Sequence, residues 1–292
     1  MRGTRLKSVG AALSAAVLSV SILAAGQEAT AAPTLSTWAP AATAEIHPGV
    51  QTYTDGGQCT ANFVFTDDAG NVYLGQAAHC SGTGAATDTN GCDAGTLPLN
   101  IEVTFNKGGS LVSGGTVVGR GTLAYSSWNT MQERNESDAN TCAYNDFALV
   151  KVAAADVAKV NPTVPFWGGP VGLNTTGTQA GDKVYSYGNS SLRGGRTELS
   201  PKTGVSLGQD PADGGWTHPL YTATPGVPGD SGSAFLDAEG NAVGTLSTLG
   251  LAPLPASNNI GDLAHELAYA QNHSGIAGLR LVLGTEPFDP AL

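Results

Sequence analysis

Short apolar runs separated by polar residues make up most of the chain from about residue 51 onward. Each run has the length of a β-strand and is shorter than a typical helix. Gly, Asn and Asp gather between the runs, and segments 66–71 and 237–241 are typical of hairpin turns. The pattern predicts strands at 61–65, 72–74, 101–105, 115–118, 147–152, 183–187, 234–235, 242–246 and 278–282.

One stretch near the C-terminus has helical periodicity instead. Its apolar residues recur at helical spacing, which predicts a helix from about Ile260 to Gln271, with Asn258 or Asn259 as the N-cap. Residues 153–160 predict a second, short helix. Segment 161–181 is rich in Gly, Pro, Thr and Asn, and it predicts a linker between two halves of similar size.

The first 31 residues are expected to form a secretory signal peptide. Basic residues precede an uncharged apolar stretch at 9–25, and Ala29-Thr30-Ala31 supplies the small residues that signal peptidase needs. The apolar stretch falls short of the ~20 residues that a membrane span needs. We therefore expect cleavage after Ala31, secretion to the extracellular space and no membrane association afterwards. Residues 32–45, rich in Ala and Thr, predict a flexible leader or short pro-segment.

The net charge and the length of the chain limit the classes of protein to which it can belong. The formal net charge is −11, so nucleic acid is not an expected partner, because binding a polyanion requires basic patches. The length after the signal peptide fits one large all-β domain or two fused barrels.

The four cysteines, Cys59, Cys80, Cys92 and Cys142, all follow the signal peptide. An even number in an oxidising compartment predicts two disulfides, for which three pairings are possible. The sequence has neither a Cys-x-x-Cys motif nor a pair of histidines at metal-binding spacing. We therefore expect no zinc site and no other metal.

The segment Gly229-Asp230-Ser231-Gly232-Ser233 is the strongest chemical signal. A serine hydroxyl is a poor nucleophile unless a base lies beside it. Flanking glycines let the backbone turn sharply and bring its amides close to a substrate carbonyl. The amides of Gly229 and Ser231 could then form an oxyanion hole.

Two further segments complete a catalytic set. His79 lies in Ala77-Ala78-His79-Cys80 after an apolar run, and Asp146 begins an apolar strand-like run. Together with the serine segment, and in the order His, Asp, Ser, they resemble the three motifs of the chymotrypsin-type serine proteases, in particular the secreted bacterial branch. The resemblance covers roughly residues 50 to 285.

The resemblance implies an all-β fold of two six-stranded antiparallel barrels, to which the sequence adds a helix near the C-terminus. We expect a protease domain at 46–292, with the first barrel at about 46–160 and the second at about 181–292. His79 would act as general base, Asp146 would orient its ring, and Ser231 would attack the scissile carbonyl. We expect a monomer that hydrolyses protein or peptide substrates without a cofactor.

The resemblance also implies a pairing of the cysteines. Cys59 and Cys80 match the family's disulfide behind the histidine loop, which leaves Cys92 to pair with Cys142.

The chain departs from the family pattern around the nucleophile. Ser233 stands where the common motif has Gly, and an activation sequence of the Ile-Val-Gly-Gly type is missing. In the animal enzymes a newly cut N-terminus pairs with the acid before the nucleophile. A buried Asp230 would need another cation here, because an unpaired buried carboxylate is costly. Arg193 and Arg196 are the candidates.

The substrate pocket is inferred from the family alignment. Its base is expected at Pro225 and one wall at Thr245 to Leu249, with Ser247 near the substrate backbone. Neither stretch contains an acidic residue, so a preference for Arg or Lys at P1, the residue before the cleaved bond, is disfavoured. We expect cleavage after residues such as Ala, Val, Leu or Phe with modest discrimination.

The remaining histidines are expected to be surface or packing residues: His47, His218, His265 and His273. One of them, His218, precedes Ser231 by thirteen positions. If the chain folded His218 into the pocket, it could attract Glu at P1.

Two other classes fit parts of the sequence. An inactive protease fold used for binding would have a broken triad, whereas all three residues are present here. An esterase of the α/β-hydrolase type would have Ser, then acid, then His, so Asp262 and His265 or His273 would have to serve. That class requires alternating strands and helices, which the apolar pattern does not show.

Overall fold

The computed structural model describes Met1 and residues 37–85, 87–250 and 257–291. Most of the predicted signal peptide and the first residues of the predicted leader therefore lie outside the described residues. The described end of that leader lies against the following domain, since Ala39 N donates to Val160 O and Asn161 Nδ2 donates to Ala39 O. None of the described helices is long and apolar enough to cross a membrane.

The first sheet has eight strands in the order β15-β3-β4-β7-β6-β5-β1-β2, and all neighbours run antiparallel. Their bounds are β1 Gln51–Thr54, β2 Gly57–Thr60, β3 Val64–Thr66, β4 Val72–Gln76, β5 Glu102–Lys107, β6 Thr116–Ser126, β7 Ala148–Val152 and β15 Arg280–Leu281. The link from β2 to β3 continues the sheet, because Ala61 N donates to Val50 O and Asn62 N donates to Gly75 O. Strands β2 and β3 thus act as one bent strand that brings the ends of the sheet together.

The second sheet has seven strands in the order β12-β9-β10-β11-β14-β13-β8. Their bounds are β8 Gly172–Leu173, β9 Lys183–Tyr187, β10 Pro201–Ser206, β11 Thr217–Thr222, β12 Ala234–Leu236, β13 Asn241–Gly250 and β14 Ser257–Asp262. Pairing of β12 with β13 closes β9 to β14 into a six-stranded barrel, and β8 adds a short parallel strand. The expected fold class, two antiparallel barrels, is confirmed.

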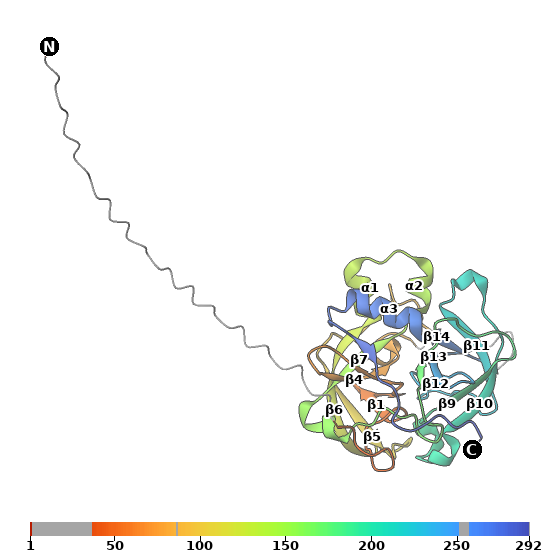
Figure 1. Ribbon diagram of the computed structural model, residues 1–292. Coiled ribbons are helices and arrows are strands. Elements are labelled where there is room, and N and C mark those ends of the chain that lie inside the picture. The colour runs from red at the N-terminus through yellow and green to blue at the C-terminus, as the bar shows by residue number, and fades with distance from the viewer. Residues whose placement is uncertain (2–36, 86, 251–256, 292) are drawn as a thin grey trace. The chain divides into compact units, whose positions relative to one another are not determined.

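Helices are few and gather at one end of the molecule (Figure 1). They are α1 Ser127–Arg134, α2 Ala139–Tyr144 and α3 Leu263–His273, and the short 3₁₀ turns include η1 Ala78–Ser81 and η2 Ala154–Lys159. The predicted helix exists but begins later than expected. Ile260 belongs to β14, and Asp262 caps α3 by accepting a hydrogen bond from His265 N at 2.9 Å.

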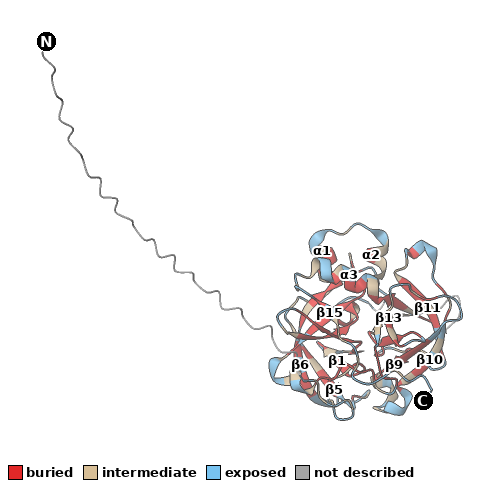
Figure 2. Cartoon of the chain, in the orientation of Figure 1, coloured by how far each residue is buried: buried red, intermediate tan, exposed pale blue. Residues whose placement is uncertain are grey.

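The core lies within and between the barrels, as the buried strands in Figure 2 show. One apolar cluster fills the first barrel and a smaller one the second. A third cluster joins them, since it contains Phe63 and Phe147 from the first barrel and Tyr185 and Leu236 from the second. Leu263 and Leu267 of α3 belong to this joining cluster. The C-terminal segment also returns to the first sheet, because β15 pairs with β3.

Two disulfides link Cys59 to Cys80 and Cys92 to Cys142, the pairs that the family resemblance implies. The first lies directly beside His79. The second ties Cys142 of α2 to a loop 50 residues earlier in the chain.

Replacing both Cys92 and Cys142 by Ser is expected to lower the free energy of unfolding by about 4 kcal/mol, because the unfolded chain would regain the freedom of a 50-residue loop. Urea denaturation of the variant and the parent would measure the difference. An unchanged midpoint would contradict the expectation.

Candidate active site

His79 and Asp146 are held together at the edge of the first barrel. His79 lies in η1 immediately after β4, and Asp146 lies between α2 and β7. Asp146 Oδ2 is 2.7 Å from His79 Nδ1, and Asp146 Oδ1 accepts from the His79 backbone N at 2.8 Å. The carboxylate therefore fixes both the ring and the backbone of His79, and it leaves ring atom Nε2 facing away from the pair.

Ser247 of β13 reaches the same carboxylate from the second barrel. Its Oγ donates to Asp146 Oδ2 at 2.6 Å. The sequence predicts Ser247 in the pocket wall near the substrate backbone, and it gives no signal of this bond. The contact makes the orientation of Asp146 depend on both barrels.

The environment of His79 raises the pKa of its ring above the ordinary value of 6.5. Burial is the largest influence and by itself lowers the pKa, since it disfavours the imidazolium. The charge of Asp146 and its hydrogen bond oppose burial and together outweigh it. Asp146 thus stabilises a protonated ring.

Ser231 lines the same cavity as His79. Its backbone O accepts from Thr60 N at 2.9 Å, which ties the serine loop to the first barrel. Among the hydrogen bonds of the described residues, none joins His79 Nε2 to Ser231 Oγ. The side chains of the expected triad therefore share one cavity, with only the His79–Asp146 pair in direct hydrogen-bond contact.

Both glycines around Ser231 are required by the geometry. Gly229 and Gly232 have φ of +94° and +84°, which favour glycine. A Cβ on Gly232 would lie 2.6 Å from Thr60 O, and one on Gly229 would lie 2.2 Å from Gln58 Oε1. Within the described chain, the amides of Gly229 and Ser231 donate to no protein group, so both are free to bind an oxyanion.

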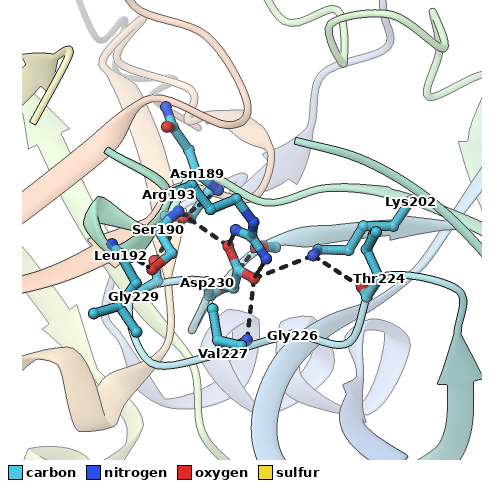
Figure 3. A network of polar contacts seen from close by, with 12 residues as sticks. Asn189, Ser190, Leu192, Arg193, Lys202, Thr224, Gly226, Val227, Gly229 and Asp230 are labelled. Atoms are coloured by element: carbon cyan, nitrogen blue, oxygen red, sulfur yellow. Dashed lines mark hydrogen bonds and ion pairs between the residues drawn. The ribbon is translucent and has the colours of Figure 1, made fainter. Parts of the chain in front are cut away.

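Asp230, the residue before the serine, is completely buried and neutralised by two cations (Figure 3). Arg193 contacts both carboxylate oxygens, and Lys202 Nζ lies 3.2 Å from Oδ2. The amides of Ser190 and Val227 donate to Asp230 at 3.0 and 3.1 Å. Of the two arginines expected from the sequence, Arg193 is the partner and Arg196 is not.

Lys202 was not foreseen as a partner. It lies on β10 with its side chain inside the second barrel, fully buried. Burial is the largest influence on its amine and, together with the charge of Arg193, lowers the pKa of Lys202 despite the attraction of Asp230. The mostly polar sequence of β10, Pro201-Lys202-Thr203-Gly204-Val205-Ser206, gives little signal that its lysine points inward.

Glu266 of α3 is a second buried carboxyl group near Asp146. Its Oε2 accepts from Thr245 Oγ1 at 3.0 Å, and its Oε1 lies 3.4 Å from Asp146 N. Burial, followed by the charge of Asp146, raises the pKa of Glu266 well above its ordinary value of 4.5. Burial thus favours the protonated form of Glu266, which lies beside the acid that orients His79.

The cavity that contains His79 and Ser231 has a volume of about 910 Å³. On the second-barrel side it is lined by Gly226, Val227, Pro228, Gly229, Ser231, Leu246, Ser247, Thr248, Leu249 and Asn258. None of these described residues is ionisable. The lining residues from the first barrel include Asp55 and Asp88.

The structure places the four expected pocket residues differently. Ser247 and Leu249 line the cavity, but Pro225 and Thr245 do not. Pro225 turns its carbonyl oxygen toward Lys202 Nζ, 3.4 Å away, and Thr245 donates to Glu266. Their polar atoms therefore serve the buried carboxylates behind the cavity.

His218 does not line the cavity and is a packing residue, as expected for the histidines other than His79. Its side chain is fully buried on β11, and its Nε2 lies 2.8 Å from Asp262 Oδ2. Asp262 also pairs with His265 at the start of α3. His218 therefore belongs to a packing network away from the cavity.

Cys59, His79 and Cys80 form the one group of possible metal ligands found close together in the described ranges. The two sulfurs are bonded to each other, so neither is available as a thiolate ligand. This group does not form a metal site.

Several solved structures of proteases are similar to this chain. Protease A of Thermobifida fusca has a TM-score of 0.49 and 17% identity, and the match covers 82% of this chain and 99% of that chain. A Nocardiopsis protease has a TM-score of 0.43 and 18% identity, covering 81% and 98% of the two chains. A glutamic acid-specific serine protease has a TM-score of 0.44 and 18% identity, covering 76% and 96%. No protein-family model and no curated protein matches the sequence.

Replacing Asp230 by Asn is expected to lower the free energy of unfolding by about 3–5 kcal/mol, because Arg193 and Lys202 would remain buried without a counter-charge. Adding Lys202→Met should recover part of the loss, since one unpaired cation is removed. Chemical denaturation of both single variants and the double variant tests this coupling. Strictly additive losses would show that the two groups do not interact.

Replacing Glu266 by Gln is expected to stabilise the protein increasingly as pH rises above about 4.5. The folded state holds the Glu266 proton above the pH at which the unfolded chain releases it, so the parent loses stability as pH rises, until the raised pKa is passed. Gln has no proton to release. Thermal unfolding of both proteins between about pH 4 and pH 9 measures the difference. A difference in Tm between the two proteins that stays constant with pH would contradict the raised pKa of Glu266.

Proposed function

We propose that the protein is a secreted serine endopeptidase that uses His79, Asp146 and Ser231. The observation that carries the proposal is the arrangement around Asp146. One carboxylate binds the Nδ1 edge and the backbone of His79 and accepts a third bond from Ser247, while Ser231 lines the cavity that His79 faces. A histidine held in this way presents Nε2 as the base that a serine nucleophile needs.

The reaction follows from these positions. Ser231 Oγ attacks the scissile carbonyl carbon and passes its proton to His79 Nε2, and the amides of Gly229 and Ser231 bind the oxyanion that forms. The protonated ring then gives its proton to the leaving amine, which leaves an acyl group on Ser231. Water then gives a proton to His79 and attacks the acyl carbonyl, the ester bond to Ser231 breaks, and the ring returns the proton to Ser231 Oγ as the acid product leaves. Catalytic hydrogen bonds often tighten only when substrate binds, so Oγ need not contact Nε2 beforehand.

The expected boundaries and location are part of the proposal. Strands β1 to β7 fall within residues 46–160, and β9 to β14 fall within 181–292. The two disulfides fit an oxidising compartment, which supports cleavage of residues 1–31 and secretion. The absence of ionisable residues from the described second-barrel wall supports an apolar P1 preference.

Treatment with a fluorophosphonate and mapping of the modified peptide tests the nucleophile. We expect the label on Ser231, and we expect Ser231→Ala to lose labelling and to lower peptide turnover by roughly 10⁴-fold or more. Ser233→Ala is the matched control, since the Ser233 hydroxyl is buried and bonded to Asp230 O. Hydrolysis that survives in Ser231→Ala would refute the mechanism. An unlabelled, inactive wild-type protein would favour a binding role instead.

The pH dependence tests His79. Only the neutral ring can accept the Ser231 proton, and Asp146 raises the pKa of that ring. Thus kcat/KM should rise through a midpoint above 6.5 and be lost below it. Asp146→Asn should reduce kcat by about 10⁴-fold. A midpoint well below 6.5 would mean that another group controls turnover.

A further inference from the structure

Asn258 lines the cavity on its second-barrel side. Two backbone segments, Gly226 to Pro228 and Leu246 to Leu249, line the same side and are called its two walls below. Asn258 lies on β14 and pairs in register with Leu249 of β13. Its side chain is buried and also lines the cavity.

The Asn258 side-chain amide forms hydrogen bonds with both walls of the cavity. Its Oδ1 accepts from Gly226 N at 2.7 Å. Its Nδ2 lies 3.4 Å from Gly226 O and 3.4 Å from Thr248 O. The side chain therefore bridges the two walls, and its polar atoms are engaged there rather than directed at a ligand.

The atoms around Gly226 leave little room beside the Asn258 side chain that bridges the two walls. A Cβ built on Gly226 would lie 2.7 Å from Leu246 Cδ2 and 2.9 Å from Asn258 Nδ2. Both side chains thus reach the backbone of the opposite wall. An aromatic or long aliphatic group could not pass between the walls without displacing one of them.

We propose that Asn258 is the specificity-determining residue of the P1 pocket and restricts cleavage to sites after small apolar residues, Ala above all. The proposal rests on the proposed function and narrows the broader apolar preference expected from the sequence. A small side chain fits in front of the Asn258 bridge, and the walls offer it no ionisable partner. Leu and Phe are excluded by size.

Peptides that differ only at P1 test the inference. The wild-type kcat/KM should favour Ala over Phe by about 100-fold or more, and Asn258→Gly should raise the value for Phe by about tenfold or more. The ratio of the Ala value to the Phe value should therefore fall by about tenfold or more in this variant. Asn259→Ala is the matched control, because adjacent strand residues point to opposite faces and Asn259 does not line the cavity. The control should keep the wild-type ratio.

The outcomes separate the two proposals. Wild-type cleavage after Phe as efficient as after Ala would overturn the role of Asn258 and leave the serine mechanism standing. An unchanged ratio in Asn258→Gly, with normal fluorophosphonate labelling of Ser231, would also overturn it. A wild-type protein that cleaves no peptide and takes no label would refute the proposed function itself. If Asn258→Gly does not fold, Asn258→Ala and the affinities of the wild type for peptide aldehydes with Ala or Phe at P1 decide the question.

Discussion

The buried carboxylate of Asp230 is the constraint on which the nucleophile loop depends. An ion with no access to water must be neutralised where it lies, and Arg193, Lys202 and two backbone amides do this from three different segments. Those contacts fix the backbone immediately before Ser231 and the turn that carries Gly229. Both cations come from the second barrel, so the loop is positioned by residues of the folded domain.

The acid that orients His79 depends equally on contacts between barrels. Asp146 comes from the first barrel, but Ser247 of β13 and Glu266 of α3 contact it from the second half of the chain. Thr245 and Ser247 stand two positions apart on β13, and they bind Glu266 and Asp146 respectively. One strand therefore supplies a hydrogen bond to each of the two carboxyl groups.

The apolar pattern and the three motifs were sufficient to predict the fold class and to bring His79, Asp146 and Ser231 to one cavity. The apolar pattern missed β1, β2, β8, β10, β11 and β14. In β10, β11 and β14 the buried positions carry polar or charged residues such as Lys202, His218 and Asn258, which the pattern does not identify as core. The same residues explain the errors at the site. A buried polar side chain is stabilised by partners that lie far away in the sequence. The spacing of apolar residues along the chain gives no information about those partners.

The rate at which a fluorophosphonate labels Ser231 in Arg193→Met tests most directly whether the internal ion pairs hold the nucleophile loop. Arg196→Met serves as the control, and both variants are compared with wild type where circular dichroism shows them folded. We predict that Arg193→Met slows labelling by about 10- to 100-fold, because the oxyanion-binding amides lose their fixed position, and that Arg196→Met leaves it unchanged. Labelling at the wild-type rate in folded Arg193→Met would contradict this account.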